Sequence, residues 1–162
     1  MKLTFTLIAL LLLNCSFAQN QILFAKIKDD GFKITADTVK LKKRVIELLF
    51  KEEQRAPNFS ISVEKRNTVG EVSDEYYCVI LTDSEHNITV AKWLEKRKNK
   101  LYITDQLVSE NYLQVYYTAC IGQENCSPQI VVADSKKYWA CAQASNDLAA
   151  SQCTKSIGVI IK

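Results

Sequence analysis

The stretch that decides the fold is ADTVKLKKRVIELLFKEEQRAPNFSISVEK, residues 36–65, in which the hydrophobic period changes from helical to extended. Four apolar positions in its first half recur at the spacing of one helix face, namely Leu41, Val45, Leu48 and Leu49. Asp37 or Thr38 can cap a helix here and Pro57 stops it. The pattern predicts an amphipathic helix over residues 38–55, with an apolar face wide enough to pack on a sheet.

Strand-like alternation begins directly after this helix. Phe59, Ile61 and Val63 alternate with polar neighbours, which is the period of a half-buried strand. Residues 76–81 present apolar side chains to both faces. Further strands are predicted at 22–27, 88–94, 101–103, 113–119, 129–133, 137–142 and 156–161. Short strands joined by turns predict an α+β domain, in which a mostly antiparallel meander is covered on one face by the main helix.

The first 18 residues have the order of a secretory signal peptide. Lys2 precedes an uncharged, leucine-rich run over residues 3–13, and Ser16-Phe17-Ala18 places small residues at the cleavage positions. The run is shorter than the roughly 20 residues of a membrane-spanning helix. Cleavage after Ala18 would leave residues 19–162, a single domain of 144 residues whose formal charge is +2, because Lys2 is lost from the chain's +3. We therefore expect an exported protein, periplasmic or extracellular.

Cys15 leaves a second outcome open. It lies where a bacterial lipoprotein would be cleaved and acylated, although Asn14 is not the small residue preferred before such a cysteine. Lipidation at Cys15 would make the chain an outer-membrane lipoprotein. A membrane partner is expected only in that case.

The four cysteines of the last third predict disulfide bonds, because an exported chain meets an oxidising compartment. They are Cys120, Cys126, Cys141 and Cys153. The most local scheme pairs the first with the second and the third with the fourth, but four cysteines allow three connectivities. A four-thiolate zinc site is disfavoured, because the gaps of five and eleven residues exceed the usual ligand spacing.

Two groups of side chains are candidates for binding surfaces. Lys40, Lys43 and Arg44 crowd the start of the predicted helix, against its dipole, and suggest a patch for an anionic ligand. A solvated helix face is the simpler interpretation. Adjacent aromatic residues on predicted strands suggest an exposed aromatic surface for carbohydrate or protein, unless a second layer buries them. Its candidates are Tyr116, Tyr138 and Trp139.

Groups for catalysis are scarce. His86 is the only histidine and lies in a polar turn, where solvation is its ordinary state. Cys78 lies within an alternating strand, which predicts a buried hydrophobe, because a reactive thiol needs a base beside it. We therefore predict no catalytic residues, no metal site and no cofactor. The 21 basic and 18 acidic residues are too evenly balanced to predict nucleic acid as a partner.

The leader and the tail resemble a family of short, uncharacterised exported proteins of Bacteroidota with a cysteine-rich C-terminal region. The resemblance lies in Ser16-Phe17-Ala18-Gln19-Asn20, Cys126-Ser127-Pro128, Trp139-Ala140-Cys141 and Cys153-Thr154-Lys155-Ser156, together with Cys120. It implies export and disulfide bonds, and it implies no activity.

These observations favour a non-catalytic exported module that binds an unknown protein or carbohydrate. An inhibitor of a secreted hydrolase is the second hypothesis, with the loop between Cys120 and Cys126 as its rigid probe. A small enzyme that uses Cys78 or scattered carboxylates is the third.

Overall fold

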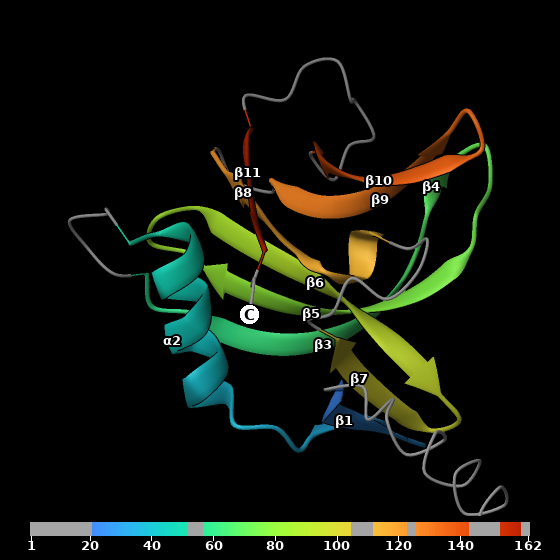
Figure 1. Ribbon diagram of the computed structural model, residues 1–162, viewed down its shortest axis with the longest axis horizontal. Coiled ribbons are helices and arrows are strands. Elements are labelled where there is room, and N and C mark those ends of the chain that lie inside the picture. The colour runs from blue at the N-terminus through green and yellow to red at the C-terminus, as the bar shows by residue number, and fades with distance from the viewer. Residues whose placement is uncertain (1–20, 52–56, 105–111, 123–125, 143–152, 160–162) are drawn as a thin grey trace, which may run out of the picture.

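The computed structural model describes residues 21–51, 57–104, 112–122, 126–142 and 153–159, and Figure 1 shows their arrangement. The described chain consists of one α-helix and a mostly antiparallel, half-closed β-structure in two sheets. The predicted α+β class with one main helix is therefore confirmed. The signal peptide and Cys15 lie outside the described residues.

The elements follow one another along the chain in the order β1 Gln21–Lys28, β2 Gly31–Ile34, α2 Thr38–Leu49, β3 Ser60–Asn67, β4 Val69–Gly70, β5 Glu75–Asp83, β6 Ile88–Arg97, β7 Lys100–Thr104, the 3-10 turn η1 Tyr112–Gln114, β8 Tyr116–Ile121, β9 Ser127–Ala133, β10 Lys136–Ala142 and β11 Thr154–Val159. Each predicted strand has a counterpart among the described residues, with ends that differ by a few residues, and residues 160–161 of the last predicted strand lie outside them. Among the described helices, none is long and apolar enough to cross a membrane.

Helix α2 is shorter than predicted. Its first turn is capped by Asp37, whose Oδ1 accepts a hydrogen bond from the Lys40 N–H at 3.0 Å. The helix ends at Leu49, because Phe50 leaves helical geometry with φ −131° and ψ 23°. The Phe50 ring is buried against the ring of Phe59, 5.9 Å away between centroids. Residues 52–55 of the predicted helix lie outside the described residues.

The large sheet has the strand order β11-β8-β6-β7-β1-β2, and β5 pairs with both β6 and β3. The small sheet has the order β10-β9-β4, in which the short β4 runs parallel to β9. The hairpins β1–β2, β5–β6, β6–β7 and β9–β10 are local, as a meander requires. The pairs β1–β7, β6–β8 and β11–β8 connect segments that are distant in sequence.

Strand β6 changes its partner halfway along its length. Residues Ile88 to Ala91 pair with β8, whereas residues Glu95 to Arg97 pair with β7 along the same edge of β6. No described strand pairs with the residues between them on this side, among them Lys92. The large sheet therefore splits between β8 and β7.

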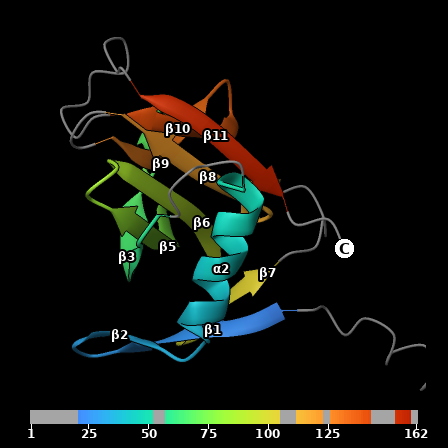
Figure 2. The same cartoon turned by 90° about the vertical axis from the view of Figure 1, so that its left-hand side faces the viewer.

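Two cores lie on opposite faces of β5 and β6. Tyr77, Val79 and Leu81 pack into the core beneath α2. Alternate residues of the same strand, including Cys78, pack with Trp139 into the core beneath the small sheet. Figure 2 shows α2 in front of the large sheet, with β1 and β2 below it and the small sheet at the top. Because both faces of β5 are covered, its sequence is a continuous apolar run.

Both disulfides join the large sheet to the small one. Cys120 on β8 bonds Cys141 on β10, and Cys126, before β9, bonds Cys153, before β11. The cysteine set is as predicted, but the most local pairing scheme is wrong. Cys120 and Cys126 are close in sequence, yet the strands beside them belong to different sheets, so each cysteine meets a partner across the layers.

Candidate functional site

A pocket of about 420 Å³ lies between the start of α2 and strands β1, β7 and β8. These are the strands on either side of the split in the large sheet. Figure 2 shows α2 standing over this part of the sheet. The split opens the pocket because no backbone pairing closes β8 onto β7 there.

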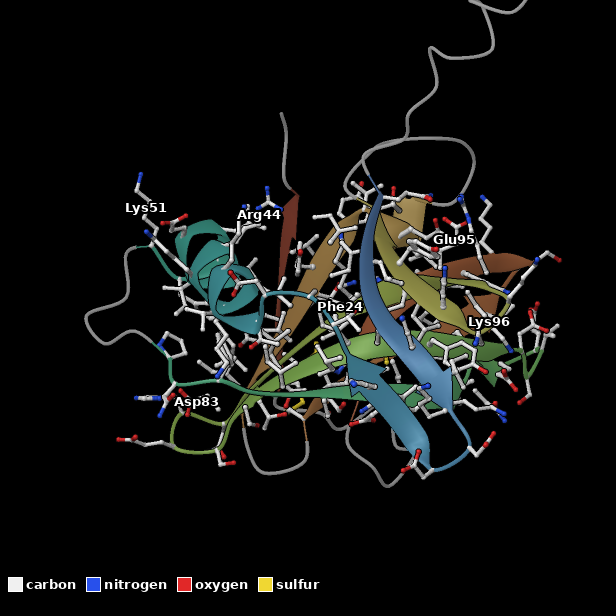
Figure 3. All side chains as sticks on the ribbon, turned by 90° about the horizontal axis from the view of Figure 1, so that it is seen from below. Phe24, Arg44, Lys51, Asp83, Glu95 and Lys96 are labelled. Carbon is white, nitrogen blue, oxygen red and sulfur yellow. A yellow bond between two sulfur atoms is a disulfide. The ribbon has the colours of Figure 1, made fainter. Side chains whose placement is uncertain are left out.

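The inner wall of the pocket is apolar. Phe24, Ile103 and Tyr117 come from three different strands and are 1, 4 and 0% exposed. Leu41 closes the wall from α2 and belongs to the same core. Figure 3 shows Phe24 near the middle of the molecule and Arg44 on α2. A ligand in this pocket would meet the hydrophobic core directly.

The mouth of the pocket is cationic. Lys40 and Arg44 are four residues apart, one helical turn, and both line the pocket together with Asp37. The Asp37 carboxylate is engaged by the helix N-terminus through the Lys40 N–H. Lys43 points elsewhere: its side chain is 78% exposed and lies 3.9 Å from Glu47. The structure therefore places two residues of the predicted anionic-ligand patch at one pocket and leaves the third in solvent.

Lys92 lies behind the pocket wall, next to Tyr117. Its burial is not predicted in the sequence analysis. Its side chain is fully buried, its Nζ donates a hydrogen bond to the Val115 carbonyl at 3.0 Å, and it lies 4.3 Å from the centre of the Tyr117 ring. A buried ammonium needs such compensation. The signal in the sequence is a lysine at an inward position of β6, between Val90 and Leu94.

Cys78 does not lie in surroundings that would make it a nucleophile. It is completely buried in the core under the small sheet, on the face of β5 that points away from the pocket. Burial raises the pKa of its thiol to about 12, in spite of the nearby Arg66 guanidinium, which lowers it. The thiol is protonated at neutral pH and behaves as a hydrophobe, as predicted.

His86 holds a turn together with Asp83. The His86 Nδ1 lies 2.9 Å from the Asp83 Oδ2, and the Asp83 side chain is only 2% exposed. The same carboxylate accepts hydrogen bonds from the N–H groups of Asn58, Glu85 and His86 at 2.7, 3.0 and 3.2 Å. The expectation of a merely solvated histidine is wrong, because the fold supplies a buried carboxylate partner.

The three aromatic candidates do not form one surface. Trp139 is 2% exposed, and its indole N–H donates to the Leu113 carbonyl at 3.2 Å, so its place on an aromatic surface is wrong. Tyr138, its neighbour on β10, is 44% exposed, and Tyr116 on β8 is partly buried. The second sheet covers one ring of the adjacent pair, which sequence alone left undecided.

Within the part of the chain that the structure describes, no group of three or more histidine, cysteine, aspartate or glutamate side chains could hold a metal ion. No protein-family model matches this chain, and no curated protein and no solved structure matches it either. The fold and the pocket therefore carry the functional argument by themselves.

Proposed function

We propose that this protein is an exported binding module that takes a small amphipathic anion into the pocket beneath α2. The observation that carries the proposal is the pairing of an apolar inner wall with a cationic mouth, where Lys40 and Arg44 lie. An apolar body would occupy the wall, and an acidic group would remain at the mouth.

The size of the pocket and its apolar lining support this function. Its volume of about 420 Å³ is in the range of small-molecule sites, about 300–1,000 Å³. Of the apolar residues that line the pocket, Ile22 is 47% exposed and Ala36 is partly exposed, so a bound hydrocarbon or aromatic group can cover their surface. A hydrophilic sugar would leave these side chains without matching contacts, so the ligand class is amphipathic.

The electrostatics of the mouth support an acidic group. The Lys40 side chain is exposed and forms no ion pair with a described residue. Lys40 is in the first turn of α2, where the aligned peptide dipoles add positive potential, and Arg44 adds its own charge one turn further along the helix. Both contributions favour a carboxylate, sulfate or phosphate group over a neutral or cationic one.

The disulfides agree with an oxidising compartment outside the cytoplasm, as the predicted leader requires. We place the module in the periplasm or outside the cell. The alternative of an inhibitor loses its premise, because Cys120 and Cys126 do not close the loop between them. The enzyme alternative based on Cys78 is disfavoured by the buried, protonated thiol.

Three probes with one tail test the proposal: dodecanoate, dodecanol and dodecylammonium, titrated by calorimetry below their micelle concentrations. We expect dodecanoate to bind at least about tenfold more tightly than dodecanol, and dodecylammonium to bind most weakly. Ala36→Phe, which places a ring in the pocket, should abolish all binding. Equal affinities for the three probes would disprove the anion preference.

Matched substitutions on α2 locate the charge effect. Lys40→Gln with Arg44→Gln should remove the preference for dodecanoate and retain binding of dodecanol, because only the mouth changes. Lys42→Gln with Lys43→Gln removes the same charge from residues of the same helix that do not line the pocket. If this control pair has the larger effect, the pocket is not the site.

A further inference from the structure

Cations form a row across four adjacent strands of the large sheet. Lys26 on β1 is directly opposite Lys33 on β2 and opposite Lys100 on β7. Lys100 is in turn opposite Arg97 on β6. Directly opposite residues in antiparallel strands share a face, so the four side chains project from the same face.

This face is turned away from α2. Ala25 and Leu101, the neighbours of Lys26 and Lys100 in sequence, belong to the core beneath the helix, so the cations point the other way. Lys33, Arg97 and Lys100 are exposed, and Lys26 is partly so. Figure 3 views the molecule from this end, with β1 and β2 nearest the viewer.

The three lysines of the row form no ion pair with any described residue. Arg97 is engaged by Glu95, whose Oε1 accepts from its Nε at 2.7 Å. Lysines directly opposite one another in a sheet are destabilising. Protection of a sheet edge explains a lysine on β2, but it does not explain Lys26 and Lys100, whose strands are paired on both sides.

We infer that this row, Lys33-Lys26-Lys100-Arg97, is a docking surface for a linear acidic polysaccharide. Adjacent strands are about 4.8 Å apart, so a chain lying across them meets one cation at each strand. A sugar ring is about as long as this spacing, and a polyuronate carries one carboxylate on each ring. The four cations are successive cross-strand partners, one on each of four neighbouring strands, so they follow a line across the sheet that suits a chain.

The aromatic residues near the row favour a polysaccharide over single-stranded nucleic acid. Sheets that bind single strands stack bases on exposed aromatic rings. Tyr102 lies beside the row on β7, but the Arg97 guanidinium covers its ring at 5.6 Å from the centroid. Trp93 packs against the core beneath the small sheet. Charge pairing is therefore the recognition available on this face.

The test uses the chain without its leader and titrates polygalacturonate, neutral dextran and oligothymidylate at low and moderate salt. Polygalacturonate should bind and weaken as salt rises, and dextran should not bind. Lys26→Gln with Lys100→Gln should weaken polygalacturonate binding by at least about tenfold, because two central contacts are lost. The control pair Lys51→Gln with Lys136→Gln removes equal charge from exposed sites elsewhere and should change binding by less than about twofold.

Lys26→Glu separates binding from folding. It converts two repulsive cross-strand pairs, with Lys33 and Lys100, into attractive pairs. The midpoint of thermal unfolding should stay the same or rise, while polygalacturonate binding is lost. The proposal would be overturned if the pair Lys26→Gln with Lys100→Gln and the control pair lost equal polygalacturonate affinity. It would also be overturned if the unmodified protein did not bind polygalacturonate. Tighter binding of oligothymidylate through the same lysines would overturn the polysaccharide assignment.

Discussion

Cys120 and Cys141 form a disulfide that joins β8 of the large sheet to β10 of the small sheet, with Cα atoms 5.6 Å apart. The second bridge connects the same two sheets from Cys126, just before β9, to Cys153, just before β11. The contact between the sheets is also polar: Arg66 on β3 donates hydrogen bonds to the Ser127 hydroxyl and the Pro128 carbonyl. The small sheet is therefore fastened to the large one at several points.

Removal of either bridge should destabilise the protein without changing its fold. We expect Cys120→Ala with Cys141→Ala to lower the free energy of unfolding by about 2–4 kcal/mol, because each bridge constrains a separation of more than 20 residues in the unfolded chain. Urea unfolding measures the change. Cys126→Ala with Cys153→Ala should have a similar effect, since its separation of 27 residues is comparable. Peptide mapping that found the pair Cys120–Cys126 would contradict the connectivity.

Asp83 should make the free energy of unfolding depend on pH in the acid range. Burial by itself raises the pKa of this carboxyl, but hydrogen bonds from the His86 ring and from the Asn58 and His86 N–H groups hold the pKa below its ordinary value of 3.8. A depressed folded-state pKa stabilises the protein above the unfolded pKa. This stabilisation is lost as pH falls below about 4, through the folded pKa.

Asp83→Asn checks this dependence through urea unfolding at a series of pH values. The variant should be less stable at pH 7 by about 1–2 kcal/mol, because the hydrogen bonds to a charged acceptor are weakened. Between pH 5 and pH 2 the variant should also lose less stability than the wild-type protein. The difference between the two losses is the contribution of the Asp83 carboxyl. Asp30→Asn, in an exposed turn, serves as the control. Parallel acid curves for Asp83→Asn and the wild-type protein would refute the role of this carboxyl.

Cys78 should be unreactive in the folded state. Burial raises the pKa of its thiol to about 12, so little thiolate forms near neutral pH. The mature chain without reductant should incorporate no iodoacetamide at pH 7.5 and one equivalent after unfolding in urea. Rapid labelling of the native protein would show that β5 opens or that the thiol lies at a surface.

Two glycines with positive φ should differ in their tolerance of alanine. At Gly31, with φ +132°, an added Cβ meets no atom within 4 Å. At Gly70, with φ +104°, it would overlap the Val132 carbonyl oxygen, where β4 runs beside β9. Both substitutions introduce backbone strain of about 1 kcal/mol. Gly70→Ala should be the more destabilising, because it adds the overlap with the Val132 carbonyl oxygen to this strain. Equal shifts in the thermal midpoint would mean that β4 is not held against β9.

Much of the local structure could be predicted from the sequence. The helix start at Asp37, the strands and the two-sided burial of β5 follow from side chains a few residues apart. Part of the site could be predicted as well: the crowding of cations at the helix start predicts a patch of Lys40, Lys43 and Arg44, of which Lys40 and Arg44 line the pocket. The pocket itself could not be predicted, since it depends on β6 exchanging β8 for β7.

The sequence by itself determined the periodicity of each element, and with it the class of fold. It also determined that four cysteines would be bridged. Only the tertiary structure decided which cysteines meet, that Trp139 is covered, and that Lys26, Lys33 and Lys100 lie opposite one another. The physical reason is range: helix and strand periods arise between neighbouring residues, whereas register and layer contacts depend on segments brought together by burial of the whole core.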